Sequence, residues 1–235
     1  NQCLSGNSYT FTNNSTISAG SMSFAWNFGD GTTSSSTNPT ITYASANSYT
    51  VKLVATSTNG CKDSTSQTVT VFPRTFTSFT VNNATQCQNN NSYLFTNTSS
   101  IASGTFTSLW SFGDGTTSSL ENPVTKYITT GIYNNQLIVT TLFGCKDTAF
   151  AMPVIKIVNS PKIAIGGDTA LCTPAFANFS GQILVPDTSA FSWKWKFANG
   201  NFSTLRNPPR QIYPLPGNYT IEAIATNSSG CMDSL

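Results

Sequence analysis

The chain has 235 residues, with 11 basic and 9 acidic side chains, a net charge of +2 and no histidine. This balance argues against nucleic acid or an anionic membrane as a dedicated partner. The lack of histidine excludes Ser-His-Asp and Cys-His catalytic arrangements, and the few carboxylates are too scattered to indicate an acid–base pair. We therefore predict that the chain is not an enzyme and needs no cofactor.

One six-residue pattern occurs three times along the chain. It is Trp-Asn-Phe-Gly-Asp-Gly at 26–31, Trp-Ser-Phe-Gly-Asp-Gly at 110–115 and Trp-Lys-Phe-Ala-Asn-Gly at 195–200. Each Trp follows a cysteine by 23 residues and is itself followed by Asn-Pro, two tyrosines and Gly-Cys-x-Asp. The period is 84 residues and then 85, so the sequence predicts three tandem copies of one small domain.

We place the domains at residues 1–73, 74–160 and 161–235, with short proline-containing linkers that favour a semi-rigid rod. The first domain lacks the opening strand of the other two and the third lacks the closing strand, so we expect both to be truncated. Polar and apolar residues alternate, as at Tyr49, Val51 and Leu53, and helical periodicity is absent. The pattern predicts an all-β chain of three Ig-like β-sandwiches.

The aromatic residues of the repeated pattern are the predicted core anchors. Two residues apart on a strand, they share one face, and the Asp-Gly or Asn-Gly that follows favours a tight turn. Asn135 stands on the same inward face, so it must find hydrogen-bond partners or lie at a bulge. Trp193 shares the parity of Trp195, which favours core packing over a sugar-binding platform. The anchors are Trp26, Trp110, Trp195, Phe28, Phe112 and Phe197.

Six cysteines, two in each repeat at one spacing, indicate disulfides. A zinc site would need CxxC spacing or histidine, and the chain has neither. A bond that closes a loop of 58 or 59 residue steps would stabilise each domain by roughly 4 kcal/mol. Disulfides imply an oxidising compartment outside the cytoplasm. The predicted pairs are Cys3–Cys61, Cys87–Cys145 and Cys172–Cys231.

These landmarks resemble the polycystic kidney disease (PKD) domain, whose pattern is Trp-x-Phe-Gly-Asp-Gly, Asn-Pro-x-x-x-Tyr and then Gly-x-Tyr-x-Val-x-Leu. The resemblance covers nearly the whole chain. Repeat one has Asn47 where the family has the last glycine, and repeat three has Ala198-Asn199 for Gly-Asp. The added cysteine frame is similar to PKD arrays in type IX secreted surface proteins and gliding-motility adhesins of Bacteroidota.

The resemblance implies an extracellular, cell-surface stalk or adhesin segment of a longer protein, without catalytic activity. Its partners would be neighbouring repeats, with surface glycans or other cell-surface proteins as further candidates. The alternative that the resemblance leaves open is an accessory or carbohydrate-binding module of a secreted hydrolase. The complete sequence of the protein would separate the two, because a catalytic domain favours the second.

Two further sets of residues are site candidates. Asp30 and Asp114 are weak candidates for calcium, and we favour a structural role in their own turns, because Asn199 replaces the carboxylate in repeat three. Asp-Ser/Thr tripeptides resemble the O-glycosylation motif of Bacteroidota, although the same residues also suit a turn. The candidate hydroxyl residues are Ser64, Thr148, Thr169 and Ser234.

Overall fold

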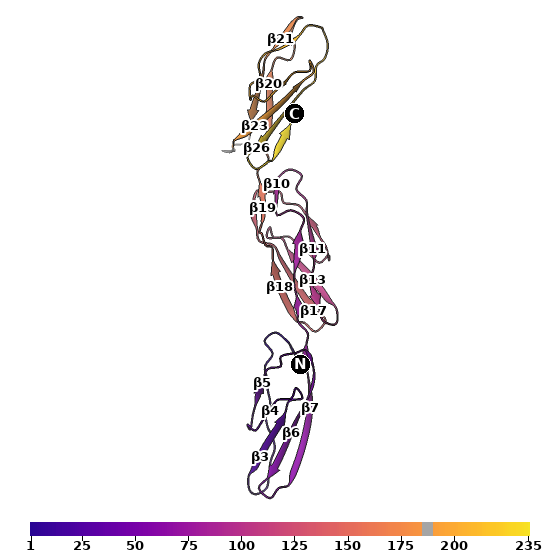
Figure 1. The fold of residues 1–235 in the computed structure, drawn as a ribbon, viewed down its shortest axis with the longest axis vertical. Coiled ribbons are helices and arrows are strands. Elements are labelled where there is room, and N and C mark those ends of the chain that lie inside the picture. Colours follow the sequence, from indigo (N-terminus) through magenta and orange to yellow (C-terminus); the bar gives the residue numbers. More distant parts are fainter. Residues whose placement is uncertain (185–189) are drawn as a thin grey trace. The chain divides into compact units, whose positions relative to one another are not determined.

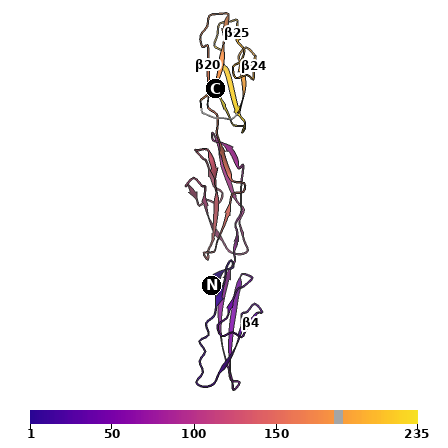
Figure 2. The ribbon, with the colours of Figure 1, turned by 90° about the vertical axis from the view of Figure 1, so that its left-hand side faces the viewer.

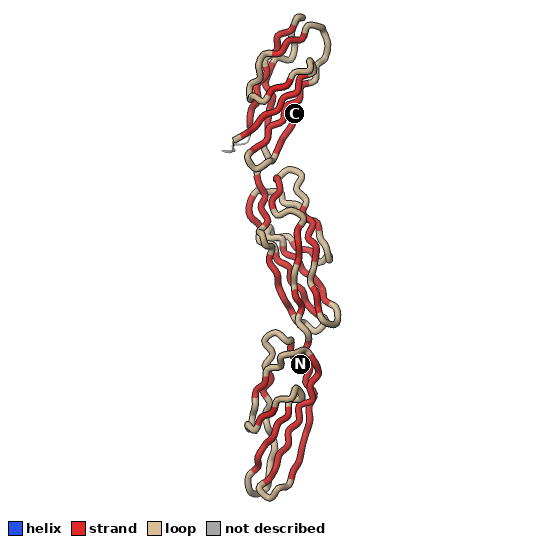
Figure 3. Tube along the Cα trace, in the orientation of Figure 1, coloured by secondary structure: helices blue, strands red, loops and turns tan. Residues whose placement is uncertain are grey.

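The computed structural model describes residues 1–184 and 190–235. These residues form strands and turns without a helix, as Figure 3 shows, so the all-β prediction is confirmed. The chain divides into two compact units. The first contains residues 1–80, 95–123 and 135–151, and the second contains residues 81–94, 124–134 and 152–235. Both units therefore include strands of repeat two.

Repeat one lies entirely in the first unit and forms a sandwich (Figure 1). Its larger sheet has the order β1-β7-β6-β3-β4, and β2 pairs with β5 in the facing layer. The strands are β1 (Gln2–Cys3), β2 (Tyr9–Thr10), β3 (Met22–Asn27), β4 (Thr33–Ser34), β5 (Thr40–Ile41), β6 (Asn47–Ser57) and β7 (Lys62–Phe72). The residues buried between the layers are Tyr9, Phe11, Trp26, Phe28, Tyr43, Tyr49, Val51, Leu53, Val69 and Val71.

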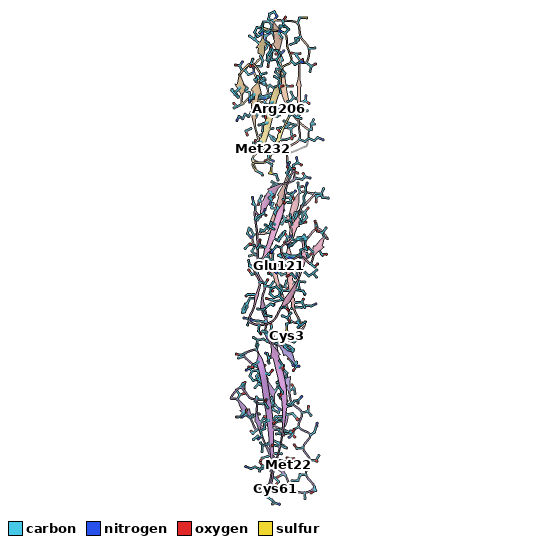
Figure 4. The ribbon with its side chains drawn as sticks, turned by 90° about the vertical axis from the view of Figure 1, so that its right-hand side faces the viewer. Cys3, Met22, Cys61, Glu121, Arg206 and Met232 are labelled. Carbon is cyan, nitrogen blue, oxygen red and sulfur yellow. A yellow bond between two sulfur atoms is a disulfide. The ribbon has the colours of Figure 1, made fainter. Side chains whose placement is uncertain are left out.

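The short first strand has a position that matters for the cysteines. β1 runs parallel to the end of β7, with Gln2 beside Val71 and Cys3 beside Phe72. Cys61 directly precedes the start of the same strand, β7, which is 11 residues long. Cys3 and Cys61 consequently lie at opposite ends of repeat one, as Figure 4 shows.

The first unit also contains one sheet of repeat two, in the order β14-β13-β17-β18, and the pair β12-β8. Its core anchors pack as in repeat one: Phe95 lies 5.5 Å from Trp110 and 5.3 Å from Phe112, centroid to centroid. The strands are β8 (Thr75–Phe76), β12 (Ser100–Ile101), β13 (Phe106–Ser111), β14 (Thr117–Ser118), β17 (Gln136–Thr141) and β18 (Lys146–Phe150); the unit boundary falls within β9 (Phe79–Val81) and β11 (Tyr93–Asn97).

In the second unit, repeat two contributes a sheet in the order β10-β19-β16, in which β10 and β19 are parallel. This repeats the arrangement of β1 and β7, because Cys87 lies beside Val158 at the end of β19. Tyr93, Tyr127 and Tyr133 are buried here, and the last two rings stack at 4.1 Å. The strands are β10 (Thr85–Cys87), β15 (Val124–Thr125), β16 (Gly131–Tyr133) and β19 (Ile155–Val158).

Repeat three lies entirely in the second unit. Its four-stranded sheet has the order β24-β23-β26-β27, and the pairs β20-β22 and β21-β25 complete it; Figure 2 shows β20 and β24 on different sides of this repeat. The strands are β20 (Ile163–Gly167), β21 (Ala175–Ala177), β22 (Phe179–Ile183), β23 (Phe191–Phe197), β24 (Phe202–Ser203), β25 (Gln211–Tyr213), β26 (Ile221–Asn227) and β27 (Met232–Ser234). The buried core is Ile163, Trp193, Trp195, Phe197, Ala223 and Ala225.

Asn135 is buried, and its environment follows from its polarity. The strand that is continuous as β6 in repeat one is interrupted here between β16 and β17, at residues 134–135. The Asn135 side chain donates from Nδ2 to the Phe112 carbonyl oxygen at 2.9 Å, and the backbone carbonyl oxygen of Asn135 accepts from Ala151 N at 2.9 Å. Both predicted outcomes therefore occur together: the amide is bonded and the strand is interrupted.

Asn135→Val should destabilise the fold, although it restores the apolar residue type of repeat one. The variant removes the donor to the Phe112 carbonyl in a buried place, which costs about 1–3 kcal/mol. Chemical denaturation would measure it. Asn134→Ala is the matched control, because Asn134 is exposed and should change stability by less than about 0.5 kcal/mol. A stability gain in Asn135→Val would contradict the role assigned to the amide.

Candidate functional site

The disulfides join neighbouring repeats. Cys3 of repeat one bonds to Cys145 of repeat two, and Cys87 of repeat two bonds to Cys231 of repeat three, with Cα–Cα distances of 5.6 Å. Each bond lies within one compact unit. The predicted pairs within repeats, Cys3–Cys61, Cys87–Cys145 and Cys172–Cys231, are wrong; Cys61 and Cys172 are exposed free thiols.

Strand length explains why the two cysteines of repeat one do not bond to each other. Cys3 lies beside the last residue of β7 and Cys61 precedes its first. At about 3.3 Å per residue, the 11 residues of β7 separate the two cysteines by roughly 35 Å. A disulfide needs Cα atoms within about 7 Å. The first cysteine of a repeat therefore lies at the end that leads into the next repeat, where the next repeat's second cysteine meets it.

The second cysteine of each repeat sits in the same type of hairpin turn. In repeat two, Thr141 N donates to the Cys145 carbonyl at 2.8 Å, and Cys145 N donates to Thr141 Oγ1 at 3.1 Å. In repeat one, Ser57 and Cys61 make the same two bonds at 2.9 and 3.1 Å. Asn227 replaces the hydroxyl residue in repeat three and bonds Cys231 N through Oδ1 at 3.0 Å. All three turns therefore present the cysteine alike.

Other contacts in the first unit surround the Cys3–Cys145 bond. The Phe72 ring, at the end of repeat one, stacks on Phe143 of the repeat-two hairpin at 3.9 Å. Asp147, two residues after the cysteine, accepts from Thr77 N at 2.9 Å and so holds the segment that enters repeat two. Burial acts to raise the pKa of Asp147, but the hydrogen bonds from Thr77 and Thr148 outweigh it and the pKa lies below its usual value.

The second unit repeats this arrangement around Cys87–Cys231. Asp233 accepts from Ile163 N at 2.9 Å, as Asp147 does from Thr77. The Asn227 side chain donates from Nδ2 to the Asn159 carbonyl at 2.9 Å, which ties the hairpin to the linker. The Asp of Gly-Cys-x-Asp thus holds the entry to its own repeat, a role that the sequence alone did not predict.

The six predicted core anchors lie in the repeat cores, each at most 6% exposed. Each main tryptophan donates its indole N–H to a carbonyl ten residues later: Trp26 to Ser36, Trp110 to Leu120 and Trp195 to Leu205. Trp193 is also buried, and a Cβ on Gly181 would lie 2.5 Å from its ring. Gly181 therefore makes room for Trp193 in the core, which leaves this tryptophan no exposed face for a sugar.

The turn aspartates have structural partners. Asp30 Oδ1 accepts from Thr32 N and Oγ1 at 2.9 and 2.6 Å, and Asp114 does the same with Thr116. The glycines on either side of Asp30 have φ of +83° and +93°, and a Cβ on Gly29 would lie 2.8 Å from the Thr50 carbonyl oxygen. Within residues 1–184 and 190–235, no three acidic or cysteine side chains gather as metal ligands. The geometry favours the structural role for these aspartates.

The four candidate glycosylation residues are all exposed. Ser64, Thr148 and Ser234 lie on β7, β18 and β27, just after the hairpin cysteines, and Thr169 follows β20 in a loop.

Two buried polar residues, Asn7 and Asn91, were not predicted from the sequence. Each is buried and bonds both backbone groups of a core tyrosine, Tyr43 or Tyr127. Their common position four residues after a cysteine was the available signal.

The PKD domain family model matches this chain at residues 2–72, 78–154 and 158–235. The chain belongs to the PKD domain family. Similar proteins include the collagenase ColA of Bacillus cereus, 43% identical over 60 residues, which are 25% of this chain and 6% of the collagenase. The chain thus spans a small part of that relative. The predicted all-β fold of three tandem PKD domains, which are Ig-like sandwiches, is confirmed.

Solved PKD domains of two Vibrio proteins are also similar. The PKD1 domain of Vibrio anguillarum Epp is 23% identical, and the match covers 36% of this chain and 96% of that domain, with a TM-score of 0.31. The PKD1 domain of the Vibrio cholerae metalloprotease PrtV is 31% identical over 36% of this chain and 95% of that domain, with a TM-score of 0.29.

In the described part of this PKD chain, no helix has the length and hydropathy to span a membrane.

Proposed function

We propose that this PKD array is a non-catalytic extracellular spacer that holds and displays other parts of a longer cell-surface protein. Tandem PKD domains are typical of extracellular adhesin and spacer segments, and they are non-catalytic modules. The observation that carries the proposal is the pair of disulfides between successive repeats. They add a second covalent connection wherever a linker joins two repeats.

The second connection limits how a linker can bend. Between repeats one and two, the chain passes through Phe72, Pro73 and Arg74, and Pro73 itself restricts rotation. Cys3 lies beside Phe72 and bonds to Cys145. Two covalent connections therefore join repeats one and two at this junction, the linker and the disulfide. The Phe72–Phe143 stack adds an apolar contact. A hinge held at two points resists the bending that a spacer must avoid.

The cellular setting is the finer part of the proposal. The cysteine frame supports a place in type IX secreted surface proteins or gliding-motility adhesins of Bacteroidota, with adhesion to surface glycans or cell-surface proteins as a further role. Exposure of Ser64, Thr148, Thr169 and Ser234 is compatible with O-glycosylation there. Intact-mass analysis of protein from the native host tests this, and unmodified residues would reject it.

Similarity to the collagenase supports a second candidate function, an accessory module of a secreted hydrolase. Such a module would bind the substrate of its hydrolase. Pull-down with insoluble collagen separates the two candidates, because a spacer should remain in the supernatant even if it adheres to surface glycans. Retention on collagen would favour the accessory function.

Small-angle X-ray scattering of the purified chain tests the spacer function. We expect the profile of an elongated particle, unchanged by a chelator or by added calcium, because the aspartates of the turns bond within their own turns. The double variant Cys3→Ser/Cys87→Ser is the control and should give a broader distribution of distances. A compact, globular profile for the wild-type chain would contradict the spacer function.

A further inference from the structure

One end of repeat one carries a hollow next to the exposed Cys61. Its volume is about 450 Å³, and its wall combines apolar residues with a carboxylate. Met22, Leu53 and Ala55 supply the apolar part, and Asp63 lies beside Cys61. Figure 4 shows Met22 and Cys61 together at this end, away from Cys3. A hollow that combines apolar side chains, a carboxylate and a thiol suits a peptide segment better than a small ion.

The corresponding place in repeat two is filled by the segment that enters the repeat. There β8 packs against β17 and β18, and Phe79 contacts Trp110 at 5.0 Å. The backbone N–H of Thr77 on this segment donates to Asp147 Oδ2, the counterpart of Asp63. In repeat three, Ile163 is buried in the core and its N–H donates to Asp233 Oδ2. Two repeats thus show the same occupant on the same carboxylate oxygen.

Asp63 and Cys61 lie in the same turn geometry as the corresponding aspartate and cysteine of repeats two and three, but they lack the contacts with an entering segment. Asp63 accepts from Ser64 N through Oδ1 at 2.7 Å, as Asp233 does from Ser234 N. Among residues 1–184 and 190–235, Asp63 Oδ2 has no hydrogen bond like those of Asp147 and Asp233. Cys61 makes the two turn bonds of Cys145 with Ser57, but its thiol is free.

We propose that this end of repeat one docks the end of another PKD repeat of the same type. The first cysteine of that repeat bonds to Cys61, and the segment that leaves it fills the hollow and donates a backbone N–H to Asp63. Cys172, the first cysteine of repeat three, is free as well and bonds in the same way to the hairpin cysteine of a further repeat. The proposal deepens the spacer function and rests on it for the presence of further repeats; scattering tests that function separately.

The covalent step is a thiol–disulfide exchange. Two thiols, that of Cys61 and that of the incoming cysteine, each lose one proton and one electron as the S–S bond forms. Oxidised glutathione, or an oxidoreductase disulfide, takes up both electrons and both protons and leaves as two thiols. An oxidising compartment supplies such a disulfide.

The repeat period provides a direct test with the full chain. A second copy of residues 1–84 is added in front of the chain. Residue 1 of the original chain then follows the added copy in the same way that residue 85 follows residue 84. The first cysteine of the added copy then precedes Cys61 by 142 residues, the separation of Cys3 and Cys145. After folding in a glutathione redox buffer, non-reducing peptide mapping should find this added cysteine bonded to Cys61. The hairpin cysteine of the added copy should now be the free thiol.

Two variants of the extended chain test the hollow as well as the bond. Asp63→Ala should lower the equilibrium constant for the new disulfide against glutathione about tenfold, because one hydrogen bond to a charged acceptor is lost. Lys52→Ala, at an exposed position of β6 outside the hollow, should leave this constant unchanged. A Cys61 that stays free in the extended chain, or a bond inside the added copy, would overturn the proposal.

Discussion

Trp110→Ala should destabilise repeat two by about 3–5 kcal/mol, the loss typical of a large aromatic side chain truncated to alanine in a core. Trp110 is fully buried and packs between Phe79 and Phe95. The variant also removes the indole N–H that donates to the Leu120 carbonyl at 2.9 Å. Thermal or urea denaturation, followed through repeat two by hydrogen exchange, would measure the loss.

Leu109→Ala is the matched control, because Leu109 precedes Trp110 on β13 and is 50% exposed on the opposite face. It should change stability by less than about 0.5 kcal/mol. Hydrogen exchange in repeat three should stay unchanged in both variants. Equal melting curves for Trp110→Ala and the wild type would show that the tryptophan is not a core anchor.

Cys145→Ser should weaken repeat two by about 4 kcal/mol, although repeat two contains no internal disulfide partner for Cys145. Cys3 lies beside Phe72 in the folded repeat one, so the bond ties the hairpin of repeat two back to its own entry point. When repeat two unfolds alone, the bond therefore closes a loop of about 70 residues, from the linker to Cys145. Loop-closure entropy for that length gives the expected loss.

Cys61→Ser provides the control for this prediction. Cys61 occupies the same hairpin turn in repeat one but is a free, exposed thiol, so its replacement should leave stability nearly unchanged. Denaturation under non-reducing conditions measures both variants. If the bonds were instead Cys3–Cys61 and Cys87–Cys145, Cys61→Ser would lower the stability of repeat one by a similar amount.

The repeat frame and the core were predictable because each depends on local pattern. Trp26, Trp110 and Trp195 share one spacing from the cysteines, and alternation assigns them to the inward face. Burial of Asn135 followed from the same alternation. The hydrogen-bond partner of Asn135 could not be predicted in this way, because the Phe112 carbonyl is 23 residues away and reaches Asn135 only through the packing of two strands.

The disulfide pairing could not be read from spacing. In a tandem array, cysteines at a fixed interval within one repeat are also at a fixed interval from those of the next. What decides the pairing is the parallel placement of β1 along the end of β7, which sets Cys3 about 35 Å from Cys61. That placement is a pairing between strands that are far apart in the sequence, and the composition of β1 and β7 does not predict it.

The two disulfides also determine how the chain responds to proteolysis. Along the sequence the bonded cysteines alternate, Cys3 and Cys87 first and then their partners Cys145 and Cys231, so the two closed loops overlap. A single cut between Cys3 and Cys231 leaves the ends joined, and so do cuts in any two of the segments 4–86, 88–144 and 146–230. Only when all three segments are cut do the ends separate. Bonds within repeats would let one cut between Cys61 and Cys87 release the distal part, whereas the overlapping loops keep a nicked array attached.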